Sequence, residues 1–238
     1  MQAANPQVIA GARVTGFYER NPWKRLERTL QLTYALTFGS REEAERAAER
    51  INDVHRRVHG VDEITGKPYD ALDPELLLWV HACLVDSALR FEELTVGELD
   101  DAGRQRFHEE QMVAAEMVLL PRDRIPPTVA ELRSYIDEVV ASGDVLVTDA
   151  ARRVADLFFH PPPEAEWRPV LRGVSRWAFG SLPPEIRRQY GVRWSPARDL
   201  AMRSSLAALR LVRPAIPPRF RFIQPYQDRL AEARAGAA

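Results

Sequence analysis

The segment that most constrains the fold is an apolar run that follows a strong helix-start signal. Asp73-Pro74-Glu75 combines an N-cap residue with a proline in the first helical turn. The helix that begins there is apolar on every side, through Leu76, Leu77, Leu78, Trp79, Val80, Ala82, Leu84, Val85, Ala88 and Leu89. A helix without a polar face has to be covered by other elements, so we expect it to run through the centre of the fold.

The same run is too short to cross a membrane. Its longest apolar stretch, Leu76–Val85, contains His81 and ends at Asp86, whereas a membrane helix needs roughly 20 apolar residues. Met1–Asn21 lacks a cationic head followed by a long apolar run, so a secretory signal is not expected either. We therefore expect no transmembrane segment.

Helix signals recur along most of the chain. Ser40 and Glu43 form a capping box, as do Thr128 and Glu131. Apolar periodicity and breakers predict helices over residues 23–36, 40–58, 73–94, 98–119, 128–143, 149–158 and 164–179, and after Pro183-Pro184 and Ser195-Pro196 to about residue 212. We find no run of period two, no internal repeat and no glycine-rich phosphate loop. The sequence thus predicts an all-α protein of about eight to ten helices.

The chain is expected to form one helical domain over residues 1–238. Its C-terminal part, residues 214–238, is predicted to be an extended tail, because Pro214–Tyr226 contains four prolines. Nothing in the sequence decides between a monomer and a homo-oligomer.

Charge and cysteine content exclude several classes of protein. The 33 basic and 34 acidic residues give a net charge of −1, which argues against a nucleic-acid partner. All but two of the basic residues, Lys24 and Lys67, are arginine. Cys83 is the single cysteine, so an intramolecular disulfide, a Cys-x-x-Cys metal site and a thiolate-bound iron–sulfur cluster are excluded. We expect a protein of a reducing compartment, the cytoplasm.

Histidines are the informative candidates for a functional site. Ala44, Ala47, Ile51, Val54 and Val58 recur at helical spacing and define a buried stripe that includes His55, with His59 at its edge. His55 is either a hydrogen-bonded core residue or a ligand. The pair also satisfies His-x-x-x-His, a metal-chelating spacing, but neither the zinc-protease glutamate nor the Glu-x-x-His pairs of di-iron bundles are present.

Two further features complete the candidate site. His81 lies on the all-apolar helix and is expected to be buried; Cys83 is expected to be inert there. Arg25, Arg28 and Thr29 share a broad helix face with aliphatic residues. The arginines either cover apolar surface or hold an anion beside an apolar cavity. A porphyrin would combine an apolar plate, two propionates and an iron that needs an imidazole.

Four segments together resemble a known family. Thr33–Ala44, Val54–Gly60, Gly66–Asp70 and Asp73–Ala82 are similar to the DUF2236 family, the catalytic domain of the oxygenase MpaB and the latex-clearing rubber oxygenases. The resemblance covers roughly residues 20–215. It implies an all-α fold with a globin-like core, one haem b, and use of O2 on an apolar, isoprenoid- or lipid-like small molecule, with cleavage of a carbon–carbon double bond.

The resemblance also assigns roles to residues. Arg25-Leu26-Glu27-Arg28-Thr29 resembles the Arg-x-x-Lys-Thr motif that lines the distal haem side, and His55 matches the axial histidine, with His59 where an arginine stands in the rubber oxygenases. Arg25 and Arg28 would hold a propionate or orient oxygen, Thr29 would supply a distal hydroxyl, and the second ring nitrogen of His55 would donate to an acceptor. His81 would be either an acid/base or supporting group near the substrate, or a core residue that makes a structural hydrogen bond.

This chain departs from the rubber oxygenases in two places. Arg28 replaces the lysine, and arginine cannot lose its proton to ligate iron. No glutamate precedes Arg25 at the family's spacing. Two alternatives therefore stay open: a non-catalytic haem or lipid carrier of the same fold, and a non-haem metal enzyme that uses His55, His59 and His81.

Overall fold

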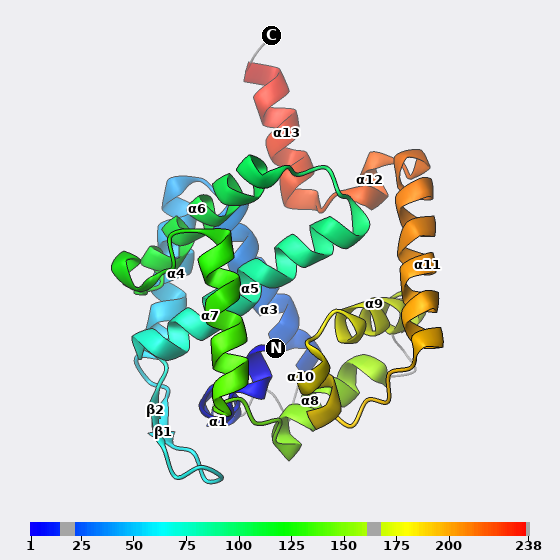
Figure 1. Cartoon of the computed structure of the whole chain (residues 1–238). Coiled ribbons are helices and arrows are strands. Elements are labelled where there is room, and N and C mark those ends of the chain that lie inside the picture. The colour runs from blue at the N-terminus through cyan, green and yellow to red at the C-terminus, as the bar shows by residue number, and fades with distance from the viewer. Residues whose placement is uncertain (15–21, 161–167, 237–238) are drawn as a thin grey trace.

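A computed structural model of the chain describes residues 1–14, 22–160 and 168–236. Helices dominate these residues, and the all-α prediction is confirmed (Figure 1). In chain order the α-helices are α1 Pro6–Val14, α3 Pro22–Phe38, α4 Arg41–His55, α5 Pro74–Thr95, α6 Asp101–Met117, α7 Val129–Ser142, α8 Asp149–Phe159, α9 Arg168–Gly180, α10 Pro184–Gln189, α11 Pro196–Val212, α12 Pro218–Arg221 and α13 Gln224–Gly236.

Short elements connect the helices. They are the 3₁₀ turns η1 Gln2–Ala4, η2 Arg122–Arg124 and η3 Arg213–Ala215, and the strands β1 His59–Val61 and β2 Pro68–Asp70. The strands pair antiparallel, with Gly60 opposite Tyr69. In the described part of the chain, no helix combines the length and the apolar character that crossing a bilayer requires.

The predicted helix starts are confirmed at the level of single hydrogen bonds. The Ser40 hydroxyl accepts from the Glu43 amide while the Glu43 carboxylate accepts from the Ser40 amide, which is the reciprocal capping box. Asp73 and Thr128 cap α5 and α7 by accepting from the amides of Glu75 and Glu131. At Thr128 only this half of the predicted capping box is found in the described part of the chain, without the reciprocal bond from Glu131. These caps are local interactions, so the sequence alone was sufficient to locate them.

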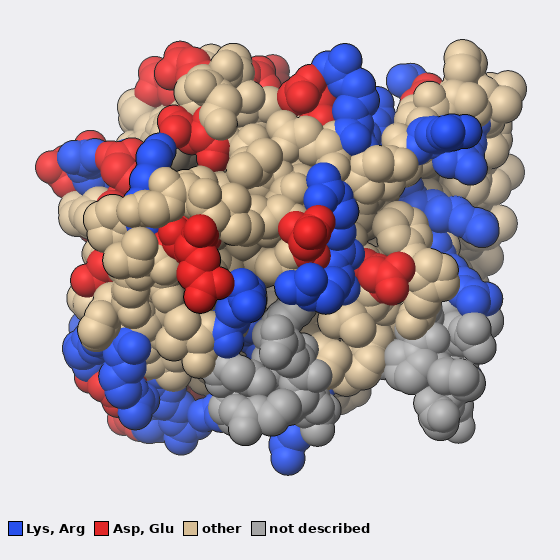
Figure 2. Space-filling model, turned by 90° about the horizontal axis from the view of Figure 1, so that it is seen from below, with Lys and Arg blue, Asp and Glu red and all other residues tan. Residues whose placement is uncertain are grey.

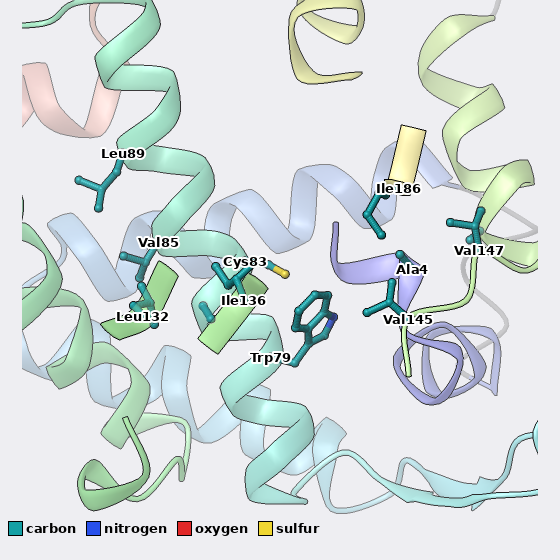
Figure 3. Packing of buried hydrophobic residues seen from close by; sticks show 12 residues of the cluster. Ala4, Trp79, Cys83, Val85, Leu89, Leu132, Ile136, Val145, Val147 and Ile186 are labelled. Atoms are coloured by element: carbon teal, nitrogen blue, oxygen red, sulfur yellow. The ribbon is translucent and has the colours of Figure 1, made fainter. Parts of the chain in front are cut away.

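Helix α5 lies at the centre of the core, as predicted. Its Trp79, Cys83, Val85 and Leu89 are at most 2% exposed and pack with side chains from η1, α7, α10 and the 145–147 segment (Figure 3). One side of α5 is nevertheless open, since Leu84 is 56% exposed. The prediction that every side of this helix is covered is therefore wrong at that position.

The C-terminal prolines start helices instead of preventing them. Pro218 and Pro225 lie in the first turns of α12 and α13, where the missing amide proton costs no intrahelical hydrogen bond. The prediction of an extended tail is therefore wrong, because it treated each proline as a helix breaker. Helix α13 packs against α3, with the rings of Phe38 and Tyr226 6.0 Å apart.

Candidate functional site

The predicted site residues on α3 and α4 belong to one helical hairpin. The two helices pack along each other around the Gly39–Ser40 turn. A Cβ at Gly39 would collide with the Ala35 carbonyl oxygen and lie 3.0 Å from Glu43 Cβ. Glycine at this position thus permits the tight turn that places residues 22–38 against residues 41–55.

Arg28 lines a groove between these two helices. The groove has a volume of about 390 Å³ and is lined by Arg28, Gln31, Leu32, Ala35, Glu43, Arg46, Ala47 and Arg50. Arg46 reaches Glu42 at 3.4 Å, and neither Arg28 nor Arg50 forms an ion pair with any described residue. Three guanidinium groups above an aliphatic floor can bind a carboxylate or phosphate that carries an apolar tail.

Arg25 and Thr29 do not line this groove. Arg25 is half-buried, and its Nη1 donates to the Ala12 carbonyl of α1 at 3.3 Å. Thr29 is exposed, and its carbonyl accepts the Thr33 hydroxyl at 2.9 Å. The structure therefore separates these three residues, which the sequence assigned to one helix face: Arg28 faces the groove and Arg25 contacts the N-terminal helix.

His55 is the last residue of α4 and is half-buried. Its Nδ1 is buried and has no hydrogen-bond partner, and burial lowers its pKa below the ordinary value. The imidazole is consequently neutral at pH 7 and keeps a lone pair free, which is the form that binds a metal. The acceptor predicted for one ring nitrogen is therefore not found at Nδ1 in the described part of the chain.

The buried stripe on α4 differs from the predicted one. Ala44 and Ala47 are buried as expected, but Val54 is 40% exposed and Asn52 is 3% exposed. The Asn52 amide donates to the Met117 carbonyl at 3.0 Å, so a polar side chain takes a buried position by gaining a partner on α6. That partner lies 65 residues away in sequence.

His59 does not share a helix face with His55. Helix α4 ends at His55, and His59 is an exposed residue of β1 whose partner across the hairpin is Asp70. A His-x-x-x-His chelate requires one continuous helix. The predicted pairing of these two histidines is therefore wrong, because the chain leaves the helix before His59.

His81 is buried as predicted, and it faces a second histidine that the sequence did not single out. The rings of His81 and His108 are 6.3 Å apart between centroids, and His108 is completely buried on α6. His108 stands four residues before Met112 and seven before Ala115, both buried. That helical spacing was the available signal for its burial.

The protonation of this pair follows from its surroundings. Burial, and secondarily the charge of His108, lower the pKa of His81 to about 4. His108 Nε2 lies 2.8 Å from the Pro126 carbonyl oxygen, so Nε2 carries the proton. Cys83 is inert as predicted, because burial raises its pKa to about 12.

The histidines do not assemble into a metal site with three ligands. Within the described ranges, no group of three or more His, Cys, Asp or Glu side chains is placed to hold a metal ion. His55, His59 and His81 lie on α4, β1 and α5 and are not brought together. The alternative of a non-haem enzyme built on these three residues is therefore not supported.

The fold and site define an all-α protein with a neutral, partly buried histidine and an arginine-lined groove. The family model for the catalytic domain of the ER-bound oxygenase mpaB/B' and rubber oxygenase matches residues 1–211. The chain therefore belongs to this family of oxygenase catalytic domains, as the sequence motifs predicted.

Two mycobacterial proteins are similar over most of the chain. They are Uncharacterized protein Mb2261 of Mycobacterium bovis and Uncharacterized protein Rv2237 of Mycobacterium tuberculosis. Each is 29% identical over 228 residues, which is 92% of this chain and 87% of the relative. No solved structure matches the chain.

The residues present fit a haem in their chemistry. His55 offers a neutral imidazole with an unpaired nitrogen. Helix α3 has no buried residue although it carries four leucines, and Leu84 and Phe91 on α5 are 56% and 48% exposed. Partly exposed apolar side chains on α3 and α5 are surface of the kind that an apolar ligand would shield from water.

Proposed function

We propose that this protein is a haem b-dependent oxygenase that uses O2 to oxidise an apolar, isoprenoid- or lipid-like small molecule, with cleavage of a carbon–carbon double bond. The proposal rests on one observation within an oxygenase family: the neutral imidazole of His55, whose buried Nδ1 has no partner. With its single cysteine buried and reduced, we assign the protein to the cytoplasm.

His55 is the proposed axial ligand, and haem iron when bound supplies the centre that activates O2. Arg28 in the groove and Arg25 beside α1 carry permanent positive charges, which suit the propionates or a polarised oxygen. Thr29 supplies an exposed hydroxyl one residue after Arg28. Because arginine keeps its proton, Arg28 can donate hydrogen bonds but cannot ligate the metal.

We assign no ligand role to His59, because it is exposed on β1. For His81 we propose only a hydrogen-bonding role, in which its neutral ring accepts a hydrogen bond. Its neutral ring, with a pKa of about 4, can accept a hydrogen bond at pH 7 but is a weak proton acceptor. Its Nε2 is buried without a partner and its ring faces His108, so substrate would have to reach this atom for the role to apply.

The test is the visible spectrum of protein purified from haem-replete cells. The wild-type protein should show a Soret band, and His55→Ala should lose it. His160→Ala is the matched control, because His160 is 70% exposed on its side chain and pairs with Asp156; this variant should keep the band. A wild-type protein without the band, or His55→Ala with the band unchanged, would refute the proposal.

A second candidate is a non-catalytic haem or lipid carrier of the same fold. It is favoured by Arg28 in the position of the family's lysine and by the missing glutamate before Arg25. Oxygen uptake separates the two: an oxygenase consumes O2 when a prenyl substrate is added to the haem-loaded protein, whereas a carrier binds haem and consumes none.

A further inference from the structure

The near-zero net charge conceals a strong separation of charge along the chain. Residues 168–227, which we call the cationic segment, contain twelve arginines and only two acidic residues, Glu185 and Asp199. The remainder of the chain contains 21 basic and 32 acidic residues. The protein is thus an anionic body joined to a strongly cationic C-terminal part.

The cationic segment folds as α9, α10, α11, η3, α12 and the start of α13. Helix α11 forms one edge of the molecule (Figure 1). Seen from below, basic side chains recur along that side of the surface; acidic side chains lie mostly away from it, where a second group of basic side chains is also seen at the lower edge (Figure 2). Arg172, Arg176, Arg193 and Arg219 are exposed and form no ion pair with any described residue.

The same segment carries the most exposed large hydrophobic side chains of the described residues. Among the large hydrophobic residues of the described ranges, the four most exposed are Leu211 at 83%, Phe220 at 72%, Leu200 at 67% and Val170 at 66%. All four lie within the cationic segment. Water-exposed aliphatic and aromatic side chains among unpaired arginines are typical of an interaction surface.

We propose that the cationic segment is a docking surface for a lipid bilayer that contains anionic phospholipids. Guanidinium groups bind phosphate oxygens in a fixed fork, and each basic residue near an anionic surface contributes favourably to binding. The exposed Leu211 and Phe220 would enter the boundary between headgroups and acyl chains. Arg219 lies over the Phe220 ring at 4.8 Å, which joins a charge to an aromatic side chain at one position.

Other occupants agree less well with this surface. A nucleic acid would use the arginines but would leave Leu200, Leu211 and Phe220 in water. A symmetric dimer through this face would place the same arginines of both copies against each other. A bilayer can bind both the arginines and the exposed apolar side chains, since its phosphates lie next to its apolar interior.

The surface goes beyond the proposed oxygenase function and does not depend on haem. If the substrate is an isoprenoid or lipid, docking would bring the enzyme to the phase in which that substrate dissolves. The binding experiment needs no turnover, so its failure and a failure of the oxygenase proposal are distinguishable.

The test is co-sedimentation of the full chain with phosphatidylcholine vesicles, with and without an equal amount of phosphatidylglycerol. The protein should bind the mixed vesicles, bind pure phosphatidylcholine far more weakly, and dissociate as salt is raised. Arg219→Glu should weaken binding by about fivefold or more, and Leu211→Ser should weaken it without changing the salt dependence. Both side chains are exposed, and circular dichroism checks that the variants are folded.

Arg41→Glu is the matched control. It makes the same change of charge at a side chain that is 92% exposed on α4, outside the cationic segment, and it should bind like the wild type. Equal binding to both vesicle types, no binding to either, or an equal loss in Arg41→Glu would overturn the proposal. So would a stable oligomer that Leu211→Ser dissociates, or stronger retention on duplex DNA than on vesicles.

Discussion

The imidazole rings of His81 on α5 and His108 on α6 lie 6.3 Å apart between centroids, and each retains one buried nitrogen without a hydrogen-bond partner. For His81 this atom is Nε2, and for His108 it is Nδ1. Protonation of His81 would place a charge in the core between two helices. The contact between α5 and α6 should therefore be sensitive to acid.

We predict that His81 makes the protein less stable as the pH falls. Its folded pKa of about 4 is below the ordinary value of 6.5, so the unfolded chain binds the proton more tightly. The stability contribution is complete above pH 6.5 and is lost as the pH falls toward 4. At pH 4.5 the loss amounts to about 2 kcal/mol relative to pH 7.

Urea unfolding at the two pH values measures this effect. Carboxylates also titrate in this range, so the comparison is with His81→Leu, which removes the titrating ring and its unpaired nitrogen. This variant should lose less stability between pH 7 and 4.5 than the wild type, while His160→Leu on the surface should behave like the wild type. Equal losses in all three proteins would contradict the prediction.

Asp86 is another buried ionisable group on α5, and it is paired. Its side chain is 5% exposed and accepts from Arg90 Nε at 2.6 Å and from Arg133 Nε at 3.3 Å. Asp86→Ala should destabilise the fold by about 2 kcal/mol, less than for a fully enclosed pair because both arginines reach solvent. Glu45→Ala, which removes an exposed pair with Arg41, should change stability little in the same denaturation assay.

Gly180 at the end of α9 permits a close approach to α11 and the residues before it. A Cβ there would overlap Met202 Sδ and lie 2.7 Å from Trp194 Cη2. Gly180→Ala should lower the free energy of unfolding by about 1–3 kcal/mol. Gly173→Ala on the same helix meets no atom within 4 Å and should raise it by about 0.5–1 kcal/mol. Thermal or chemical unfolding of both variants measures these changes. If Gly180→Ala and Gly173→Ala shift the free energy of unfolding in the same direction, the close contact at Gly180 does not determine stability.

Arg229 attaches the C-terminal helix to the hairpin that carries the candidate site. Its Nε donates to the Phe38 carbonyl at 2.5 Å, at the C-terminus of α3, and its Nη2 reaches Glu43 at 2.9 Å. Arg229→Ala should increase hydrogen exchange at the amides of α13 and at the α3–α4 turn. Arg234→Ala, an exposed change on the same helix, should leave both regions protected. If hydrogen exchange is unchanged in Arg229→Ala, the prediction is wrong, and the contacts of Tyr226 and its neighbours hold α13 in place instead.

The sequence predicted the helices well wherever local signals govern them. Ser40 with Glu43, Asp73 with Pro74, and Thr128 with Glu131 each define a helix start by contacts within three residues. The same local view failed for the C-terminal prolines and for the end of α4. A proline stops or starts a helix according to its position in the turn, and His59 leaves the helix to pair with Asp70.

The sequence by itself determined an all-α fold organised around α5, the burial of His81 and the membership in an oxygenase family. These follow from the spacing of apolar residues and from short motifs, which the order of residues contains directly. Only the tertiary structure brought His108 to His81, placed Arg28 in a groove with Arg46 and Arg50, and left the nitrogen of His55 unpaired. These relationships join residues that are far apart in sequence, or depend on the atoms around a side chain. Those atoms determine the burial, hydrogen bonding and pKa of a side chain, and the residue type alone does not.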